Sequence, residues 1–267
     1  MKIIDAHCHF DPVIEKESGL IIPKLGIDYT VSGLQDGMAK AGIVHSVLIS
    51  TRFQTNHHVR DLARKYPARF SAAATLSRAR GFAKSILELR KDLRRKSYVA
   101  IKFYLGYEKL NPLDKKWDRV YLLAQKYRIP IIFHTGDTLG PNAHLRFSHP
   151  LQLDELAVKF PKLKIVIAHL GNPWLLDAAE VVYKNPNVYA DLSGFFIGEQ
   201  KPDKYMLLRL DTALSYCGTA RIFFGTDYPL IRQADYVPFV KKLHIGKKQL
   251  ADVLFNNANR LYDLGLK

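Results

Sequence analysis

Two short apolar segments, Pro130-Ile131-Ile132-Phe133-His134 and Lys164-Ile165-Val166-Ile167-Ala168-His169, decide how this chain is expected to fold. Residues 151–160, which lie between them, carry apolar side chains at the spacing of an amphipathic helix. A buried strand, a helix and a second buried strand together predict a parallel strand pair joined by a helical crossover. Each strand also ends in a histidine, so the repeating unit places the same polar ring at equivalent positions.

The same alternation of strand and helix runs through the whole chain. Apolar, β-branched runs predict eight strands, at residues 3–6, 46–50, 70–75, 99–104, 130–134, 164–168, 188–192 and 221–224. Helical periodicity follows at residues 32–40, 56–66, 82–95, 114–127, 151–160, 174–183, 204–216 and 236–243, with two more helical segments at the C-terminus. Eight such units, without a GxGxxG loop, favour a closed barrel over an open sheet.

The sequence therefore predicts an α/β protein with a (β/α)8 TIM barrel as one domain over residues 1–267. Nothing resembles a linker, because glycine and proline are scattered between the periodic segments. Residues 10–28 have little periodicity and are expected to form a long loop after the first strand. We expect substrate identity to depend on this loop and on residues 106–113 and 136–148.

Composition restricts the class of protein. The chain has no run of signal-peptide or membrane-spanning length, which predicts a cytoplasmic protein without a membrane partner. Its two cysteines, Cys8 and Cys217, are expected to be free thiols, and Cys8 should point into the barrel wall. The formal net charge of +15 is compatible with nucleic-acid binding, but a solvated basic surface is the simpler explanation.

Polar residues end several of the predicted strands, at the edge where the active sites of such barrels form. His7 and His9 are two residues apart on an extended segment, so both imidazoles face one side and can bind the same cation. Taken alone, this pair is weak evidence. His134, His169 and Asp227 end three other strands, far apart in sequence and close together in a barrel. A packing role for all five is improbable, and we predict a metal site.

Histidine and carboxylate ligands without a thiolate suit one divalent ion. Zn²⁺ is the first candidate, and Mn²⁺, Fe²⁺ and Ni²⁺ are the alternatives. Such an ion lowers the pKa of bound water from 15.7 towards about 7, which makes the water a nucleophile at neutral pH. Asp227 is then the natural proton acceptor.

Four further residues are candidates for substrate binding. Lys102 lies inside an apolar strand and has three possible roles: a carboxylated bridge to a second metal, a charge that binds a substrate carboxylate, or a lysine that reaches solvent. We favour the second role. Tyr104 shares its face, and Arg52 and His149 follow the second and fifth strands, although each of them alone is more often structural. Asp191, after the seventh strand, is placed to orient a metal-bound histidine.

With these residues identified, the chain resembles the amidohydrolase superfamily, specifically its amidohydrolase-2 branch, which contains hydrolases and the aminocarboxymuconate-semialdehyde and resorcylate decarboxylases. The resemblance covers nearly the whole chain. It rests on Ile4-Asp5-Ala6-His7-Cys8-His9, Ile101-Lys102-Phe103, Pro130–His134, Ile167-Ala168-His169-Leu170-Gly171, Tyr189-Ala190-Asp191-Leu192-Ser193-Gly194, Phe224-Gly225-Thr226-Asp227-Tyr228-Pro229 and Asn256-Asn257-Ala258-Asn259-Arg260-Leu261.

The resemblance implies that His7, His9, His134 and Asp227 bind one catalytic ion and that His169 hydrogen-bonds the activated water or substrate. It implies a metal-dependent hydrolase acting on an amide, ester or lactone-like bond of a small molecule, or alternatively a nonoxidative decarboxylase of a carboxylated ring. The related TatD-type deoxyribonucleases carry a glutamate where this chain has Lys102, which argues against a nuclease. A nucleic-acid-binding barrel is the remaining alternative. The oligomeric state stays open, a homo-oligomer included.

Overall fold

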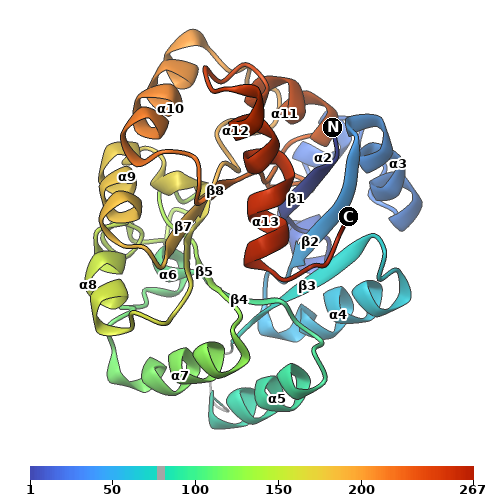
Figure 1. Cartoon of the computed structure of the whole chain (residues 1–267). Coiled ribbons are helices and arrows are strands. Elements are labelled where there is room, and N and C mark those ends of the chain that lie inside the picture. Colours follow the sequence, from blue (N-terminus) through green and yellow to red (C-terminus); the bar gives the residue numbers. More distant parts are fainter. Residues whose placement is uncertain (77–81) are drawn as a thin grey trace.

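The computed structural model describes residues 1–76 and 82–267 of the chain. Eight strands form one parallel sheet in this part, paired in sequence order from the first to the last (Figure 1). They are β1 (Ile3–Cys8), β2 (Ile43–Ile49), β3 (Phe70–Thr75), β4 (Ala100–Phe103), β5 (Ile131–Phe133), β6 (Ile165–Ile167), β7 (Val188–Asp191) and β8 (Ile222–Phe223). Each predicted strand overlaps an observed one, and the predicted (β/α)8 barrel is confirmed.

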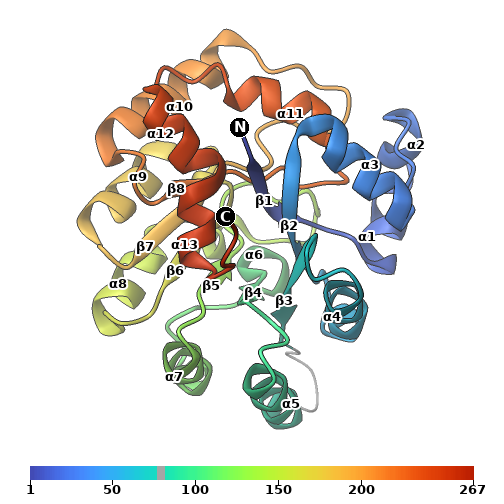
Figure 2. The same ribbon diagram turned by 45° about the vertical axis from the view of Figure 1, so that its right-hand side comes forward.

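Most of the helices surround the ring of strands in both views (Figures 1 and 2). The helices are α1 (Pro12–Glu17), α2 (Ile21–Lys24), α3 (Val31–Ala41), α4 (Asn56–Lys65), α5 (Phe82–Arg94), α6 (Leu105–Glu108), α7 (Asp118–Tyr127), α8 (Gln152–Lys159), α9 (Leu175–Lys184), α10 (Lys204–Cys217), α11 (Gln233–Val240), α12 (Lys247–Ala251) and α13 (Asn257–Leu261). None of the helices in the described residues is long and apolar enough to span a membrane.

The segment after β1 differs from the prediction. Residues 10–28 were expected to form a loop, but they contain the short helices α1 and α2. The Asp11 carboxylate caps α1 by accepting hydrogen bonds from the backbone N–H groups of Val13 and Ile14, at 2.9 and 3.2 Å. Pro12, at the first helical position, is compatible with a helix start. The helices are too short to produce a detectable periodicity.

The ring closes between β1 and the residues that follow β8. The backbone N–H of Asp227 donates to the carbonyl of His7 at 2.8 Å, and that of His9 donates to the carbonyl of Tyr228 at 2.7 Å. A Cβ atom on Gly225 would lie 2.6 Å from the Cβ of His7, so only glycine allows the two segments to approach this closely. This closure brings the ends of β1 and β8 together.

The strands separate two hydrophobic cores. The larger one lies between the strands and the helices. The smaller one fills the barrel with Ile4, Ala6, Val47, Ile49, Ala73, Ala100, Ile132, Val166, Ala168 and Phe223. Helix α13 and the residue after it add Ala258, Leu261 and Tyr262 to this inner core, with the rings of Tyr262 and Phe223 5.8 Å apart. These residues close the barrel at the end where the strands begin.

An irregularity in β1 determines where its histidines point. The register between β1 and β2 shifts between Asp5 and Cys8. Ala6 belongs to the inner core, whereas Cys8 packs in the outer one, as the sequence analysis predicted. His7 and His9 nevertheless converge on Asp227, which requires a break in the strict alternation after Ala6. The irregularity directs both imidazoles to the same site.

Candidate metal centre

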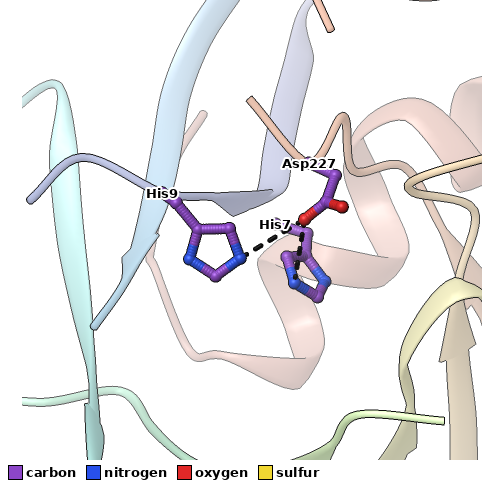
Figure 3. A group of neighbouring side chains, drawn as sticks. All are labelled: His7, His9 and Asp227. Atoms are coloured by element: carbon purple, nitrogen blue, oxygen red, sulfur yellow. Dashed lines mark ion pairs between the residues drawn. The ribbon is translucent and has the colours of Figure 1, made fainter. Parts of the chain in front are cut away.

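Three buried side chains converge where β1 and β8 end (Figure 3). The Asp227 Oδ1 atom lies 3.3 Å from His9 Nε2 and 3.7 Å from His7 Nε2. Ligand atoms on a tetrahedral ion with bonds of about 2.1 Å are separated by about 3.4 Å, so these spacings suit a shared cation. The structure therefore brings together three of the four residues predicted as ligands.

The Nδ1 atoms of His7 and His9 already have hydrogen-bond partners. His7 Nδ1 lies 2.9 Å from Oδ2 of Asp191, and His9 Nδ1 lies 2.9 Å from the Ile49 carbonyl oxygen. The Ile49 carbonyl oxygen can only accept. The Asp191 carboxylate can also only accept, because its interaction and hydrogen bond with His7 outweigh burial and hold the pKa of Asp191 below its usual value. Each Nδ1 is therefore the N–H, and each Nε2 is the ring nitrogen that faces Asp227. This orientation is the one that a metal-binding histidine requires.

His169 lies next to His7, and His134 lies next to His169. His134 Nε2 donates to the carbonyl of Asp137 at 2.9 Å, which leaves its Nδ1 bare, 3.2 Å from Nε2 of His169. The rings of His169 and His7 are 4.8 Å apart. His134 thus lies one ring further from Asp227 than the two β1 histidines, although its free nitrogen faces the same group.

The backbone at His169 and Asp227 is left-handed, with φ of 59° and 70°. Such conformations are uncommon for residues with a side chain and concentrate at functional sites. The backbone N–H of His169 donates to Asp191 Oδ1 at 2.9 Å, which holds the turn. A Cβ at Gly194 would lie 2.9 Å from His169 Nδ1, so glycine is needed where the β7 end passes this ring.

Burial controls the protonation of the imidazoles. Burial, reinforced by the positive charge of Lys102, lowers the pKa of His7 to about 3. Burial likewise lowers the pKa values of His134 and His169 below the usual 6.5. Burial alone would raise the pKa of Asp227, but the neighbouring imidazoles, His169 first, leave it well below its usual value. At neutral pH His7, His134 and His169 are therefore neutral and Asp227 is ionised, the forms that bind a cation.

Lys102 lies beside this group. Its side chain is 1% exposed, so the interpretation in which it reaches solvent is wrong. Its Nζ atom is 3.2 Å from His7 Nε2 and 5.2 Å from the centre of the Tyr104 ring. Burial lowers the pKa of Lys102 to about 8, against the attraction of Asp191 and Asp227. Lys102 therefore loses its proton at a lower pH than an exposed lysine does.

A cavity of about 350 Å³ opens beside the polar group. Its wall consists of His9, Ile14, Glu17, Ser18, Ile21, Thr51, Arg52, Tyr104, Tyr107, His134, Leu139, Gly140, His169, Asp227 and Leu230. The three segments that were expected to determine substrate identity, residues 10–28, 106–113 and 136–148, all contribute to it. A volume of this size accommodates a small molecule.

The four predicted substrate-binding residues separate into two pairs. Arg52 and Tyr104 lie on the cavity wall, whereas Lys102 and His149 are not among the described residues that line it. Lys102 is directed towards His7 within the barrel, and the His149 ring packs on Trp174 with centroids 4.7 Å apart. Lys102 is part of strand β4 and points into the barrel, whereas His149 lies in the segment before α8, whose course the sequence does not show.

Asp5 is a supporting residue that sequence reasoning missed. It is completely buried and accepts hydrogen bonds from the Oγ1 and backbone N–H of Thr226, at 2.6 and 2.9 Å. Asp5 therefore fixes the turn that carries Asp227. A carboxylate in the middle of an otherwise apolar strand was the available signal, because a buried charge needs partners.

Comparison with known proteins agrees with this architecture. An alignment over 154 residues, which covers 51% of this chain, is 30% identical to Protein fluG of Emericella nidulans and covers 17% of that protein. An uncharacterized TIM-barrel protein from Bordetella bronchiseptica matches with a TM-score of 0.83 at 20% identity, over 99% of each chain. A dihydroxybenzoic acid decarboxylase from Polaromonas sp. JS666, solved with bound manganese and the inhibitor 2-nitroresorcinol, matches with a TM-score of 0.72 at 16% identity, over 100% of this chain and 97% of the other.

The two structural matches, at these identities, establish the fold. The family follows from a different comparison, in which the model of the amidohydrolase-2 family, described as Amidohydrolase, matches residues 4–264. The match includes β1 from Ile4 onward, His7 and His9, all the other strands and the turn that carries Asp227. The chain belongs to the amidohydrolase-2 family.

Proposed function

We propose that this protein is a metal-dependent hydrolase that cleaves an amide, ester or lactone-like bond of a small molecule. One divalent ion, with Zn²⁺ as first candidate, would be held by His7, His9, His134 and Asp227. The observation that carries the proposal is the convergence of lone pairs. Three histidines direct their second ring nitrogen inward, that of His7 next to Lys102 Nζ, beside an ionised carboxylate at the edge of a cavity. A cation removes the repulsion among these acceptors.

When bound, a divalent ion polarises a carbonyl group and acidifies water. Asp227 is ionised and lines the cavity, so it can accept the proton of an attacking water. Ser193 donates its hydroxyl to Asp191, so the bond between Ser193 and His169 is made by the N–H at His169 Nδ1. His169 Nε2 is then a base, and after it takes up a proton it can donate to the developing oxyanion.

Nonoxidative decarboxylation of a carboxylated ring is a second candidate. The cavity wall favours it in one respect, because Tyr104 and Tyr107 form an aromatic surface near the cation of Arg52. Asp227 or His169 would first take up a proton from water and then deliver it to carbon as CO₂ leaves. The Polaromonas protein is named as such a decarboxylase and shares the fold.

A substrate assay tests the proposed reaction. The purified protein, loaded with metal, is assayed against a panel of lactones and hydroxybenzoates. Ring opening with uptake of water supports the hydrolase, whereas CO₂ release without water consumption rejects it and supports the second candidate. Turnover that persists after complete removal of metal contradicts both candidates.

Elemental analysis tests the site itself. We expect one ion per chain in the wild type and almost none in the double variant His7→Ala/His9→Ala. The control is His57→Ala, which removes an exposed histidine from α4 and should leave the metal content unchanged. A double variant that keeps its ion would show that the ligands lie elsewhere.

A further inference from the structure

Two hydroxyl groups beside the candidate metal centre lack hydrogen-bond partners. Ser18 and Thr51 are 2% and 4% exposed, and neither Ser18 Oγ nor Thr51 Oγ1 bonds to any group in the described part of the chain. Buried polar groups nearly always have partners, and an unpaired one is a cost that needs an explanation. Both residues line the cavity, which suggests that their partner is a ligand.

A third donor lies next to them. The Arg52 Nη1 atom donates to the carbonyl of Thr51 at 3.0 Å, which orients the guanidinium group. The Nη2 atom donates to Oε1 of Glu17 at 2.9 Å, so one carboxylate is already bound here. The side chains of Arg52 and Glu17 are 39% and 50% exposed, and ion pairs at this exposure are weak. A carboxylate arriving in the cavity can therefore replace that of Glu17.

We propose that Ser18, Thr51 and Arg52 form a subsite for a second acidic group of the substrate, and that the Glu17 carboxylate occupies Arg52 when no substrate is bound. The inference rests on the proposed function, since the first reacting group lies at the metal centre. A guanidinium and two hydroxyls are suitable donors for a carboxylate. The substrate class is then a small dianion, with one acidic group remote from the bond that reacts.

The backbone around the subsite supports a role for the side chains themselves. The N–H of Thr51 donates to Asp11 Oδ2 at 2.8 Å, so it is unavailable to a ligand. The N–H of Ser18 donates to the Ile14 carbonyl at 2.8 Å and ends helix α1. Only the hydroxyls of these two residues remain to be satisfied, and a rotation about one side-chain bond is enough to redirect each of them.

Calorimetry with paired ligands tests the subsite on the metal-loaded protein. Isophthalate and benzoate differ by one carboxylate on a ring, and glutarate and butyrate differ by one on a flexible chain. We expect the dianion of at least one pair to bind about tenfold more tightly than its monoanion, because it adds charge-assisted hydrogen bonds. Equal affinities within both pairs would overturn the proposal.

Variants of Glu17 and Thr51 make the test specific. Glu17→Gln removes the internal competitor and should tighten dianion binding by about threefold or more, with monoanion binding unchanged. Glu15→Gln, on the same exposed helix and with the same change in charge, is the matched control and should have no effect. Thr51→Val should weaken dianion binding by about threefold to tenfold without loss of thermal stability. Dianion binding that weakens in Glu17→Gln contradicts the proposal.

Repeating the titrations with metal-free protein separates this inference from the proposed function. The subsite contains none of the proposed metal ligands, so carboxylates should still bind there without metal, and Thr51→Val should still weaken that binding. Carboxylate binding that Thr51→Val weakens, in a protein that takes up no metal, would refute the proposed function alone. Metal-dependent turnover with no preference for dianions would refute the subsite alone.

Discussion

The two ends of the barrel are built from the same strands but differ in what they bury. Where the strands begin, Leu261 and Tyr262 from the C-terminal segment pack on Phe223 and close the inner core with apolar contacts. Where they end, buried side chains such as His7 and Asp227 direct lone pairs at one another. Apolar burial stabilises the fold without a ligand, whereas converging acceptors need a cation. Mutations at the end where the strands begin should therefore change mainly stability. Mutations at the end where they finish should change mainly metal binding and catalysis.

The largest expected effect is on stability, at the apolar end. Leu261→Ala removes a side chain that is 3% exposed and leaves a cavity in the inner core, which should lower the free energy of unfolding by about 2–5 kcal/mol. Denaturant unfolding measures the loss, and elemental analysis should show unchanged metal content. Leu122→Ala on α7, where leucine is 57% exposed, is the control and should change stability little. Loss of metal from Leu261→Ala would contradict the claim that stability and metal binding depend on different ends of the barrel.

At the polar end, Asp191→Asn should lower the affinity for metal. Asp191 accepts from Nδ1 of His7 and from the backbone N–H of His169, and it fixes which nitrogen of His7 faces inward. Outer partners of this kind typically contribute about 10–100-fold to metal affinity, so zinc competition titrations should show a loss of that size. Asp211→Asn removes a carboxylate that pairs with His244 outside the cavity, at 2.6 Å, and should leave affinity unchanged. Equal effects of the two variants would contradict this role.

Acid should destabilise the metal-free protein through the same end. Burial lowers the pKa of His7 to about 3 and those of His134 and His169 below 6.5, so below pH 6.5 the unfolded chain binds protons that the folded state does not. Each imidazole contributes a fall of up to about 1.4 kcal/mol per pH unit. Asp5, whose pKa burial raises to about 6, acts in the opposite direction and offsets about one of them.

The free energy of unfolding should therefore decrease between pH 6.5 and 5, as measured by denaturant titration at each pH. His7→Asn removes one of the contributing groups and should flatten this dependence, whereas the exposed His57, replaced by asparagine, should not change it. A slope that stays the same in His7→Asn would mean that this imidazole is not buried in neutral form.

Much of the architecture followed from the sequence because periodicity and strand ends are local signals. The β3 prediction matches the observed Phe70–Thr75, and the predicted grouping of His7 and His9 with Asp227 agrees with the structure. The same logic failed for α1 and α2, since helices of six and four residues carry too little pattern. Their stability comes from caps and packing, which depend on the folded chain.

The finer features of the site depend on three-dimensional relations that no local pattern contains. Strict alternation along β1 would place Ala6 and His7 on opposite faces, and only the register shift beside β2 shows that both point inward. Lys102 points towards His7 because the closed barrel brings β1 within hydrogen-bond distance of a side chain on β4. The unpaired hydroxyl of Thr51 is likewise visible only when every neighbour is placed.

The smallest expected effect compares two unpaired hydroxyls at opposite ends. The Tyr262 hydroxyl is buried and has no hydrogen-bond partner among the described residues, but it lies in the apolar core rather than on the cavity wall. Tyr262→Phe should therefore leave stability unchanged or raise it by about 1 kcal/mol, with metal content and dianion affinity unaffected. Thr51→Val should resemble it in stability and differ in ligand binding. A loss of stability in Tyr262→Phe would reveal a buried water at this hydroxyl, and the apolar end would then be less dry than its side chains indicate.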